Sequence, residues 1–135
     1  MGDKMDSISI GIDIVSTERI SKNINDDKTR FIKRIYTEDE INYCQSKEKI
    51  SHHFAGRLAG KEAVSKALKM SWDKGINWRD IEIINEKNNI PKVILHGEAK
   101  KVADERNIID IEISISHEKD YAIAFAMTIE GRKNE

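Results

Sequence analysis

Three segments of this chain alternate apolar and polar residues, and this pattern constrains the fold more than any other feature. The first segment, Ser7–Val15, places four isoleucines on one face and Ser9, Gly11 and Asp13 on the other. The segments 109–115 and 121–127 repeat the alternation near the C-terminus. A period of two is typical of a half-buried β-strand. The sequence therefore predicts strands at both ends of the chain, with Asp13 pointing away from the isoleucine row.

Helical patterns fill most of the region between these strands. Ser16 or Thr17 is suited to cap a helix that runs to about Ile24, and Asp26 and Asp27 offer a second helix start. The later elements are expected as a short helix with a capping box from Thr37 to Glu40, a long helix capped by Ser51 and reaching about Lys69, paired strands at 81–84 and 92–96, and a helix at 97–106. This order predicts an α+β fold, with a mainly antiparallel sheet packed against the long helix.

Length and composition limit the class of protein. The chain of 135 residues is expected to form one domain over residues 1–135, and its 23 basic and 24 acidic residues exclude a generally basic nucleic-acid coat protein. A single cysteine, Cys44, excludes an intramolecular disulfide and suits a reducing cytoplasm. No apolar run is long enough for a membrane span. We therefore expect a small cytoplasmic protein that binds neither nucleic acid nor membrane.

The long helix carries two adjacent polar strips. At i, i+4 spacing, Arg57, Lys61 and Ser65 form one strip, and Glu62 and Lys66 belong to the next. Cations beside a hydroxyl and a carboxylate can form a phosphate and metal surface. The same Glu62–Lys66 spacing also fits an ordinary solvated pair worth about 0.2–0.5 kcal/mol. Both interpretations fit the helix taken alone.

Two further residues are candidates for chemistry. Asp13 near the end of its strand is either a ligand-binding carboxylate or a strand-ending turn residue, and Mg²⁺ commonly uses two carboxylates together with phosphate oxygens and water. His117, which follows the strand 109–116, can contact a phosphate or transfer a proton, or simply be exposed in a loop.

Trp72 and Trp78 can stack on a base or pack within their loop.

Basic residues are concentrated between positions 19 and 34. This cluster is either a docking surface for an acidic partner or a set of solvated helix faces, and no aromatic platform for nucleic acid is interleaved with it. Its members are Arg19, Lys22, Lys28, Arg30, Lys33 and Arg34.

Taken in order, these segments resemble the holo-acyl-carrier-protein synthases, which are small 4′-phosphopantetheinyl transferases. The resemblance covers the chain from about Ser9 to Met127. It is carried by the sequences Gly-Ile-Asp-Ile-Val at 11–15 with Arg19-Ile20, Phe-Ala-Gly-Arg-Leu-Ala-Gly-Lys-Glu-Ala at 54–63 with Ser-Lys-Ala-Leu at 65–68, Ser-Ile-Ser-His at 114–117 with Tyr121-Ala122, and, more weakly, Leu-His-Gly at 95–97.

The resemblance implies a Mg²⁺-dependent transfer of phosphopantetheine from coenzyme A to a serine of apo-acyl carrier protein, a step of fatty acid biosynthesis. It assigns the metal to Asp13 and Glu62, catalytic roles to Glu62, Lys66 and His117, and carrier-protein docking to Arg19, Lys22 and Arg30. It further implies a homotrimer with active sites at subunit interfaces. Contacts with coenzyme A would come from Arg57, Lys61, Ser65, Lys66, Pro91 and His117.

Three places depart from the usual pattern of that family. Asn-Asn-Ile-Pro at 88–91 replaces an Asn-Gly-Lys-Pro turn, Glu118 replaces a threonine, and the segment 69–75 lacks a glycine-rich turn. These departures concern the contacts with coenzyme A rather than the two metal-binding carboxylates. The alternative to an enzyme is a non-catalytic module of the same fold that binds coenzyme A or a carrier protein.

Overall fold

The computed structural model describes residues 5–70 and 77–132, except for the side chains of residues 5 and 27–29. It confirms the predicted α+β class and the order of strands and helices. The main elements are β1 (Met5–Ser16), α1 (Thr17–Ile35), α2 (Glu38–Gln45), α3 (Ile50–Ala67), β2 (Ile81–Asn85), β3 (Pro91–Leu95), α4 (Gly97–Glu105), β4 (Ile108–His117) and β5 (Tyr121–Gly131).

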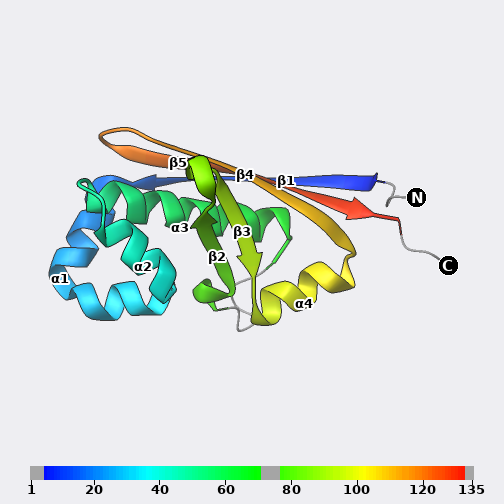
Figure 1. Ribbon diagram of the computed structural model, residues 1–135, viewed down its shortest axis with the longest axis horizontal. Coiled ribbons are helices and arrows are strands. Elements are labelled where there is room, and N and C mark those ends of the chain that lie inside the picture. The colour runs from blue at the N-terminus through cyan, green and yellow to red at the C-terminus, as the bar shows by residue number, and fades with distance from the viewer. Residues whose placement is uncertain (1–4, 71–76, 133–135) are drawn as a thin grey trace.

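A three-stranded antiparallel sheet and the long helix α3 form the centre of the molecule. β5 lies between β1 and β4, and α3 runs along one face of this sheet (Figure 1). The β5 residues that face the helix are the buried Ala122, Ala124 and Ala126. Small residues allow a close approach, and a Cβ atom at Gly11 of β1 would clash with the carbonyl oxygen of Ala63. The sheet is therefore held tightly against the helix that carries most of the candidate site.

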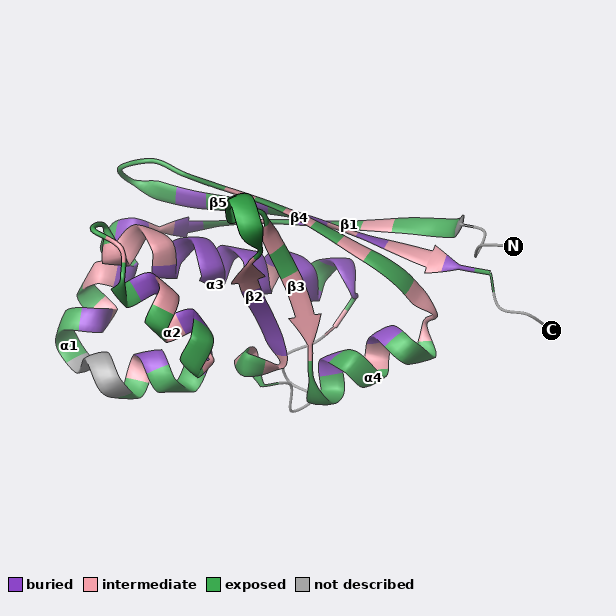
Figure 2. Ribbon diagram, in the orientation of Figure 1, coloured by how far each residue is buried: buried purple, intermediate pink, exposed green. Residues whose placement is uncertain are grey.

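The isoleucine row of β1 lies on the outer face of the sheet. Ile10 is 62% exposed and Ile12 is 57% exposed. Phe125 of β5, which is paired with Ile12 of β1, is 42% exposed. Figure 2 shows long exposed stretches on these strands. Val15 and Gly11, on the opposite face, are buried against α3. The predicted strand is confirmed, and Asp13 does point away from the isoleucines, but the core lies on the side of Asp13.

The helix starts are partly as predicted. The Ser16 side chain caps α1 by accepting from the Arg19 amide at 3.2 Å, and the Thr37–Glu40 capping box is present at the start of α2. The predicted second start at Asp26 is wrong, because α1 continues unbroken to Ile35. The predicted Ser51 cap is also wrong: α3 begins at Ile50 without a side-chain cap.

The hairpin of β2 and β3 lies beside α3, and α1 and α2 lie together at one end of the molecule with α4 at the other (Figure 1). Cys44 of α2 is a buried free thiol, as expected for a core residue. Trp78 is half-buried and packs against the core, whereas Trp72 lies outside the described residues. In the described part of the chain, no helix has the length and apolar character needed to cross a membrane.

Candidate active site

Asp13 of β1 lies against Lys66 of α3. The Lys66 Nζ atom donates to Oδ1 of Asp13 at 3.0 Å and to the carbonyl oxygen of Ile12, also at 3.0 Å. The other carboxylate oxygen of Asp13, Oδ2, is buried and has no hydrogen-bond partner among the described residues. A buried carboxylate oxygen without a partner is costly in a folded protein, so this atom points to a missing ligand.

Glu62 places a second carboxyl group beside Asp13. The pKa of Glu62 is raised to about 7, mainly because the carboxyl is partly buried; the hydrogen bond to Asp13 and the negative charge of Asp13 add to the shift, and the cations of Lys66 and Arg19 oppose it. Burial and a neighbouring carboxylate both disfavour the ionised form of a carboxyl group. The ammonium of Lys66 pairs with Asp13 rather than forming an ordinary surface pair with Glu62. We call Asp13 and Glu62 the carboxylate pair.

The carboxylate pair fits a magnesium ion. Mg²⁺ prefers hard oxygen ligands and keeps several waters, so two carboxylates together with substrate phosphates make a reasonable site. Within residues 5–70 and 77–132, no group of three or more histidine, cysteine, aspartate or glutamate side chains converges as a transition-metal site would require. A cation bound at this pair would contact the unpartnered Oδ2 atom of Asp13.

A second part of the site surrounds Arg57, which lies near the middle of α3 and five residues before Glu62. The guanidinium of Arg57, which is only 5% exposed, packs 4.0 Å above the ring of Tyr43, and its Nη2 donates to Oδ1 of Asn85 at 2.6 Å. Its Nε atom is buried and has no partner in the described part of the chain. A cavity of about 390 Å³ opens here, and its lining holds no carboxylate: Tyr43, Lys47, His53, Gly56, Arg57, Asn85, Asn89, Pro91, Ile115 and His117. We call it the histidine–arginine pocket.

His117 enters this pocket from the end of β4. Its ring centroid lies 5.1 Å from that of His53 and 5.8 Å from that of His52. Burial lowers the pKa of His117, and His52, Lys49 and Arg57 lower it further. Pro91 lines the same pocket from the start of β3. The predicted residues Arg57, Pro91 and His117 therefore meet at one cavity that suits an anion.

The carboxylate pair and the histidine–arginine pocket are separate places in one chain. His53 and Glu62 are nine residues apart on α3, which corresponds to about 14 Å along the helix axis. Arg57 faces Tyr43 and Asn85, whereas Glu62 faces Asp13 on β1. The residues predicted for one site thus form two half-sites within a single chain.

Two predicted contacts with coenzyme A need correction. Lys61 is completely buried: its Nζ lies 2.7 Å from Oε1 of Glu40 and donates to the carbonyl oxygen of Ile81 at 2.6 Å. Ser65 is 2% exposed, and its hydroxyl donates to the carbonyl oxygen of Glu62 within α3. Both side chains use their donors inside the protein, so they support the helix from within rather than reach a ligand.

The predicted docking residues Arg19, Lys22 and Arg30 are exposed on α1. Arg19 is near enough to Glu62 to lower the pKa of that carboxyl. The basic face of α1 therefore adjoins the carboxylate pair. Of the family departures, Glu118 and Ile90 are exposed, and Ile90 does not line the histidine–arginine pocket.

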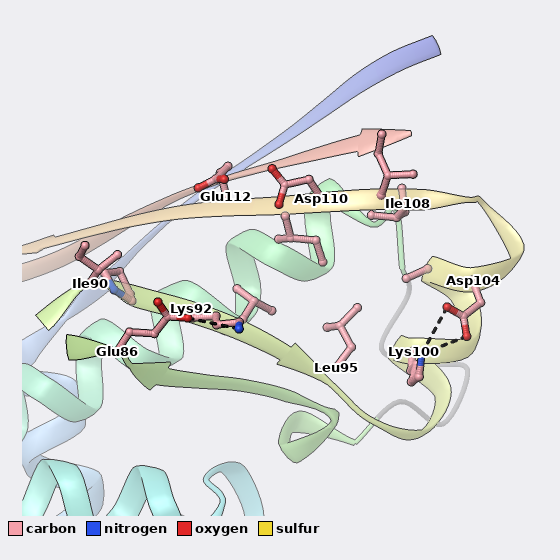
Figure 3. Close-up of a pocket in the computed structure, with 14 residues that line it drawn as sticks. Glu86, Ile90, Lys92, Leu95, Lys100, Asp104, Ile108, Asp110 and Glu112 are labelled. Atoms are coloured by element: carbon pink, nitrogen blue, oxygen red, sulfur yellow. Dashed lines mark hydrogen bonds and ion pairs between the residues drawn. The ribbon is translucent and has the colours of Figure 1, made fainter. Parts of the chain in front are cut away.

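A larger recess of about 500 Å³ lies between β3, α4 and β4 (Figure 3). Its lysines are already neutralised: Lys92 pairs with Glu86 at 3.2 Å, and Lys100 pairs with Asp104 at 3.3 Å. Its other charged lining residues, Asp110 and Glu112, are acidic. The recess therefore does not suit a phosphate ligand, despite its size.

His53, Tyr43 and Asn85 are among the residues of the histidine–arginine pocket that sequence reasoning missed. His53 precedes Arg57 by one helical turn, so helix spacing would have placed it on the same face. Tyr43 and Asn85 come from α2 and β2, and nothing in the local sequence indicates that they meet Arg57.

Comparison with known proteins identifies the family of this chain. The family model described as the 4′-phosphopantetheinyl transferase superfamily matches residues 9–126. The holo-[acyl-carrier-protein] synthase of Thermoanaerobacter sp. (strain X514) is 44% identical over 126 residues, which cover 93% of this chain and 90% of that protein.

Solved structures agree with the sequence comparison. The holo-acyl-carrier-protein synthase of Plasmodium yoelii has a TM-score of 0.81 and 32% identity, covering 98% of this chain and all of that one. The Helicobacter pylori synthase, solved in complex with coenzyme A, has a TM-score of 0.78 and 39% identity, covering 88% of this chain and 98% of that one. The chain belongs to the holo-[acyl-carrier-protein] synthase family within the 4′-phosphopantetheinyl transferase superfamily.

Proposed function

We propose that the carboxylate pair of one subunit and the histidine–arginine pocket of a neighbouring subunit together carry out the reaction of this family. In that reaction 4′-phosphopantetheine passes from coenzyme A to a serine of apo-acyl carrier protein, and adenosine 3′,5′-bisphosphate is released. The observation that supports it best is the approach of Asp13 and Glu62 from separate elements, with a buried carboxylate oxygen left without a partner. The non-catalytic alternative has no use for such a pair.

The charges of the site fit the chemistry of phosphoryl transfer. The serine hydroxyl attacks the β-phosphorus, the bond from this phosphorus to the bridging oxygen breaks, and the negative charge passes to the leaving bisphosphate. When bound, Mg²⁺ would act as a Lewis acid on the diphosphate oxygens. Lys66 is placed to bind the phosphate oxygens next to the carboxylate pair. Glu62, which lies beside Asp13, would accept the serine proton in this scheme.

Arg57 and His117 bind the nucleotide end of coenzyme A in this scheme. Arg57 is buried and its lining neighbours include no carboxylate, so a phosphate group supplies the missing negative charge. His117 donates to the same phosphates from the end of β4. Pro91 shapes the opposite wall of the cavity.

Assembly as a homotrimer would bring the two half-sites together. In a cyclic trimer each contact joins two different surfaces, so the carboxylate pair of one subunit can meet the histidine–arginine pocket of the next. A twofold contact would join identical surfaces instead. The outer face of β1 and β5 supplies apolar area for this assembly, with Ile10, Ile12 and Phe125 at its centre.

The exposed basic residues Arg19, Lys22 and Arg30 would receive the acidic surface of the carrier protein. Because Arg19 adjoins Glu62, a carrier protein docked on α1 would present its serine at the carboxylate pair. We place this activity in the cytoplasm, where a reducing environment suits the free thiol of Cys44.

Mass spectrometry of the carrier protein tests the activity directly. Incubated with apo-acyl carrier protein, coenzyme A and Mg²⁺, the protein should add one phosphopantetheine group to each carrier. D13N and E62Q should slow this transfer by at least about 100-fold. E105Q, which removes an exposed carboxylate on α4, should transfer at the normal rate. Binding of coenzyme A without any mass gain would favour the non-catalytic module.

A further inference from the structure

His53 is a titratable residue that lines the histidine–arginine pocket beside Arg57 and His117. Its ring lies between two aromatic neighbours, 5.1 Å from the ring of His117 and 5.7 Å from that of Tyr43, measured between centroids. It is one helical turn before Arg57, so both side chains face the same cavity. His53 is therefore part of the lining on which a bound phosphate would rest.

The charged groups around His53 are all cationic or able to become so. Its pKa is lowered to about 4, mainly by burial and in addition by His117 from β4, Arg57 and His52 from α3, and Lys47 after α2. No lining residue of the pocket carries a carboxylate. Without a ligand, the imidazole of His53 is therefore neutral at physiological pH.

The buried positive charge of Arg57 has no anionic partner among the residues that line the pocket. Its Nε atom has no partner in the described residues, and its only side-chain hydrogen bond there is to the neutral amide of Asn85. A buried guanidinium normally faces an anion. A phosphate group is an anion that can accept from a guanidinium and from imidazole N–H groups at the same time.

We propose that His53 is a phosphate-binding residue of this pocket and that it takes up a proton when a phosphate group of the ligand binds. This inference rests on the proposed function, because it takes coenzyme A as the source of the phosphate. The phosphate reverses the local field: it places negative charge among groups that repelled a proton from His53. The protonated imidazole then donates a charge-assisted hydrogen bond to the phosphate.

Proton uptake makes binding depend on pH in a defined direction. The pKa of His53 is about 4 in the free pocket and is raised by the bound phosphate. Below pH 4, the imidazole is protonated in both states, so binding takes up no proton. Between that pH and the higher pKa of His53 in the complex, binding takes up a proton and affinity falls by up to about tenfold per pH unit; above the pKa of the complex the affinity levels off. Affinity for coenzyme A should therefore decrease as pH rises from 5 toward neutrality.

Calorimetry with coenzyme A tests the inference. Titrations between about pH 5.5 and 7.5 in buffers of different ionisation enthalpy give the number of protons taken up. H53F keeps an aromatic ring against Tyr43 and His117 but has no titrating nitrogen. We expect this variant to take up fewer protons than the wild type and to show a flatter dependence of affinity on pH. Comparing the two proteins with the same ligand cancels the titration of the ligand itself.

A second histidine serves as the control. His96 is half-exposed and bonds to Glu82 at 3.0 Å, outside the pocket, so H96Q should take up protons as the wild type does. Dephospho-coenzyme A, which lacks the 3′-phosphate, identifies the phosphate concerned: loss of the His53-dependent uptake assigns it to the 3′-phosphate, and retention assigns it to the diphosphate.

Failure of this inference is distinguishable from failure of the proposed function. If the wild type and H53F bind coenzyme A with equal proton uptake, the role of His53 is wrong and the proposed function stands. If the wild type does not bind coenzyme A, the proposed function fails. Should H53F not fold, NMR titration of the wild-type histidines decides the matter: the pKa of His53 must rise when coenzyme A is added, and an unchanged pKa overturns the inference.

Discussion

The Nζ atom of Lys61 lies 2.7 Å from Oε1 of Glu40, and neither side chain has any exposed surface. Burial lowers the pKa of Lys61, and the carboxylate of Glu40 opposes this shift. Glu40 also accepts from the amides of Thr37 at 2.8 Å and Ile83 at 2.9 Å. One ion pair therefore joins α2, α3 and β2 beneath the histidine–arginine pocket.

Breaking this pair on one side should be strongly destabilising. K61M leaves the Glu40 carboxylate buried without its cation, and such variants lose about 3–5 kcal/mol. The double variant E40Q/K61M removes both charges but keeps an amide oxygen that can accept from the backbone, and it should regain much of that loss. Urea unfolding at a fixed protein concentration measures both values. A loss of under about 1 kcal/mol in K61M would mean that the pair contributes little.

Binding of magnesium should become weaker as pH falls below 7. The pKa of Glu62 is raised to about 7 in the metal-free protein, so this carboxyl is half protonated near neutrality. A cation must displace that proton, and affinity then falls by up to about tenfold per pH unit below 7. Calorimetric titration with MgCl₂ at several pH values measures the effect. A wild-type affinity that is unchanged between pH 5.5 and 7.5 would contradict it, and E62Q should bind weakly at every pH.

Reversing the charge of Arg19 should weaken docking of the carrier protein. R19E places a carboxylate on the basic face of α1, so we expect the KM for apo-acyl carrier protein to rise by about tenfold or more. The KM for coenzyme A should change much less, because Arg19 is not part of the histidine–arginine pocket. K101E makes the same charge change on α4 and serves as the control. An unchanged KM for carrier protein in R19E would refute the docking role.

A lysine on the outer face of the sheet should prevent assembly. Ile12 is 57% exposed in the single chain, so I12K should fold but would place a charge in the proposed subunit interface. Light scattering should show a trimer for the wild type and monomers for I12K. N25K adds the same charge to the exposed surface of α1 and should remain trimeric. A trimeric I12K would exclude this face as the interface.

Mixed trimers test whether the two half-sites come from different subunits. E62Q and H117A should each be inactive alone, but their subunits mixed in equal amounts should recover roughly a quarter of wild-type activity, because one site in four then contains two intact halves. Unfolding and refolding the two variants together produces the mixture. Activity that stays at the level of the separate variants would show that each site lies within one subunit.

The parts of the fold that depend on local sequence could be predicted. The Ser16 cap, the capping box at Thr37 and the β2–β3 hairpin each require only nearby residues, and the structure has all three. The long helix is present as well. Its start was misplaced because α3 begins without a side-chain cap, which leaves no sequence signal to find.

Burial depends on distant residues and was harder to predict. The alternation in β1 identified the strand and the direction of Asp13, but a row of isoleucines indicates a buried face unless a partner subunit is considered. Lys61 resembled a surface cation because its partner, Glu40, lies on another helix 21 positions earlier in the chain. Helix spacing could have placed His53 on the face of Arg57, but its contact with His117 depends on a strand from the far end of the chain.

The tight packing of α3 on β1 also bears on the choice of metal ion. At Gly11 there is no room for even one added carbon next to Ala63, so strand and helix are held at a fixed spacing. Asp13 follows Gly11 by two residues and Glu62 precedes Ala63 by one, so that spacing sets the gap between the carboxylates. Magnesium–oxygen distances are about 2.0–2.1 Å, compared with about 2.3–2.6 Å for calcium. A larger side chain at position 11 would therefore push apart the strand and the helix that carry the two carboxylates, and in the proposed magnesium site it would weaken binding of the smaller cation.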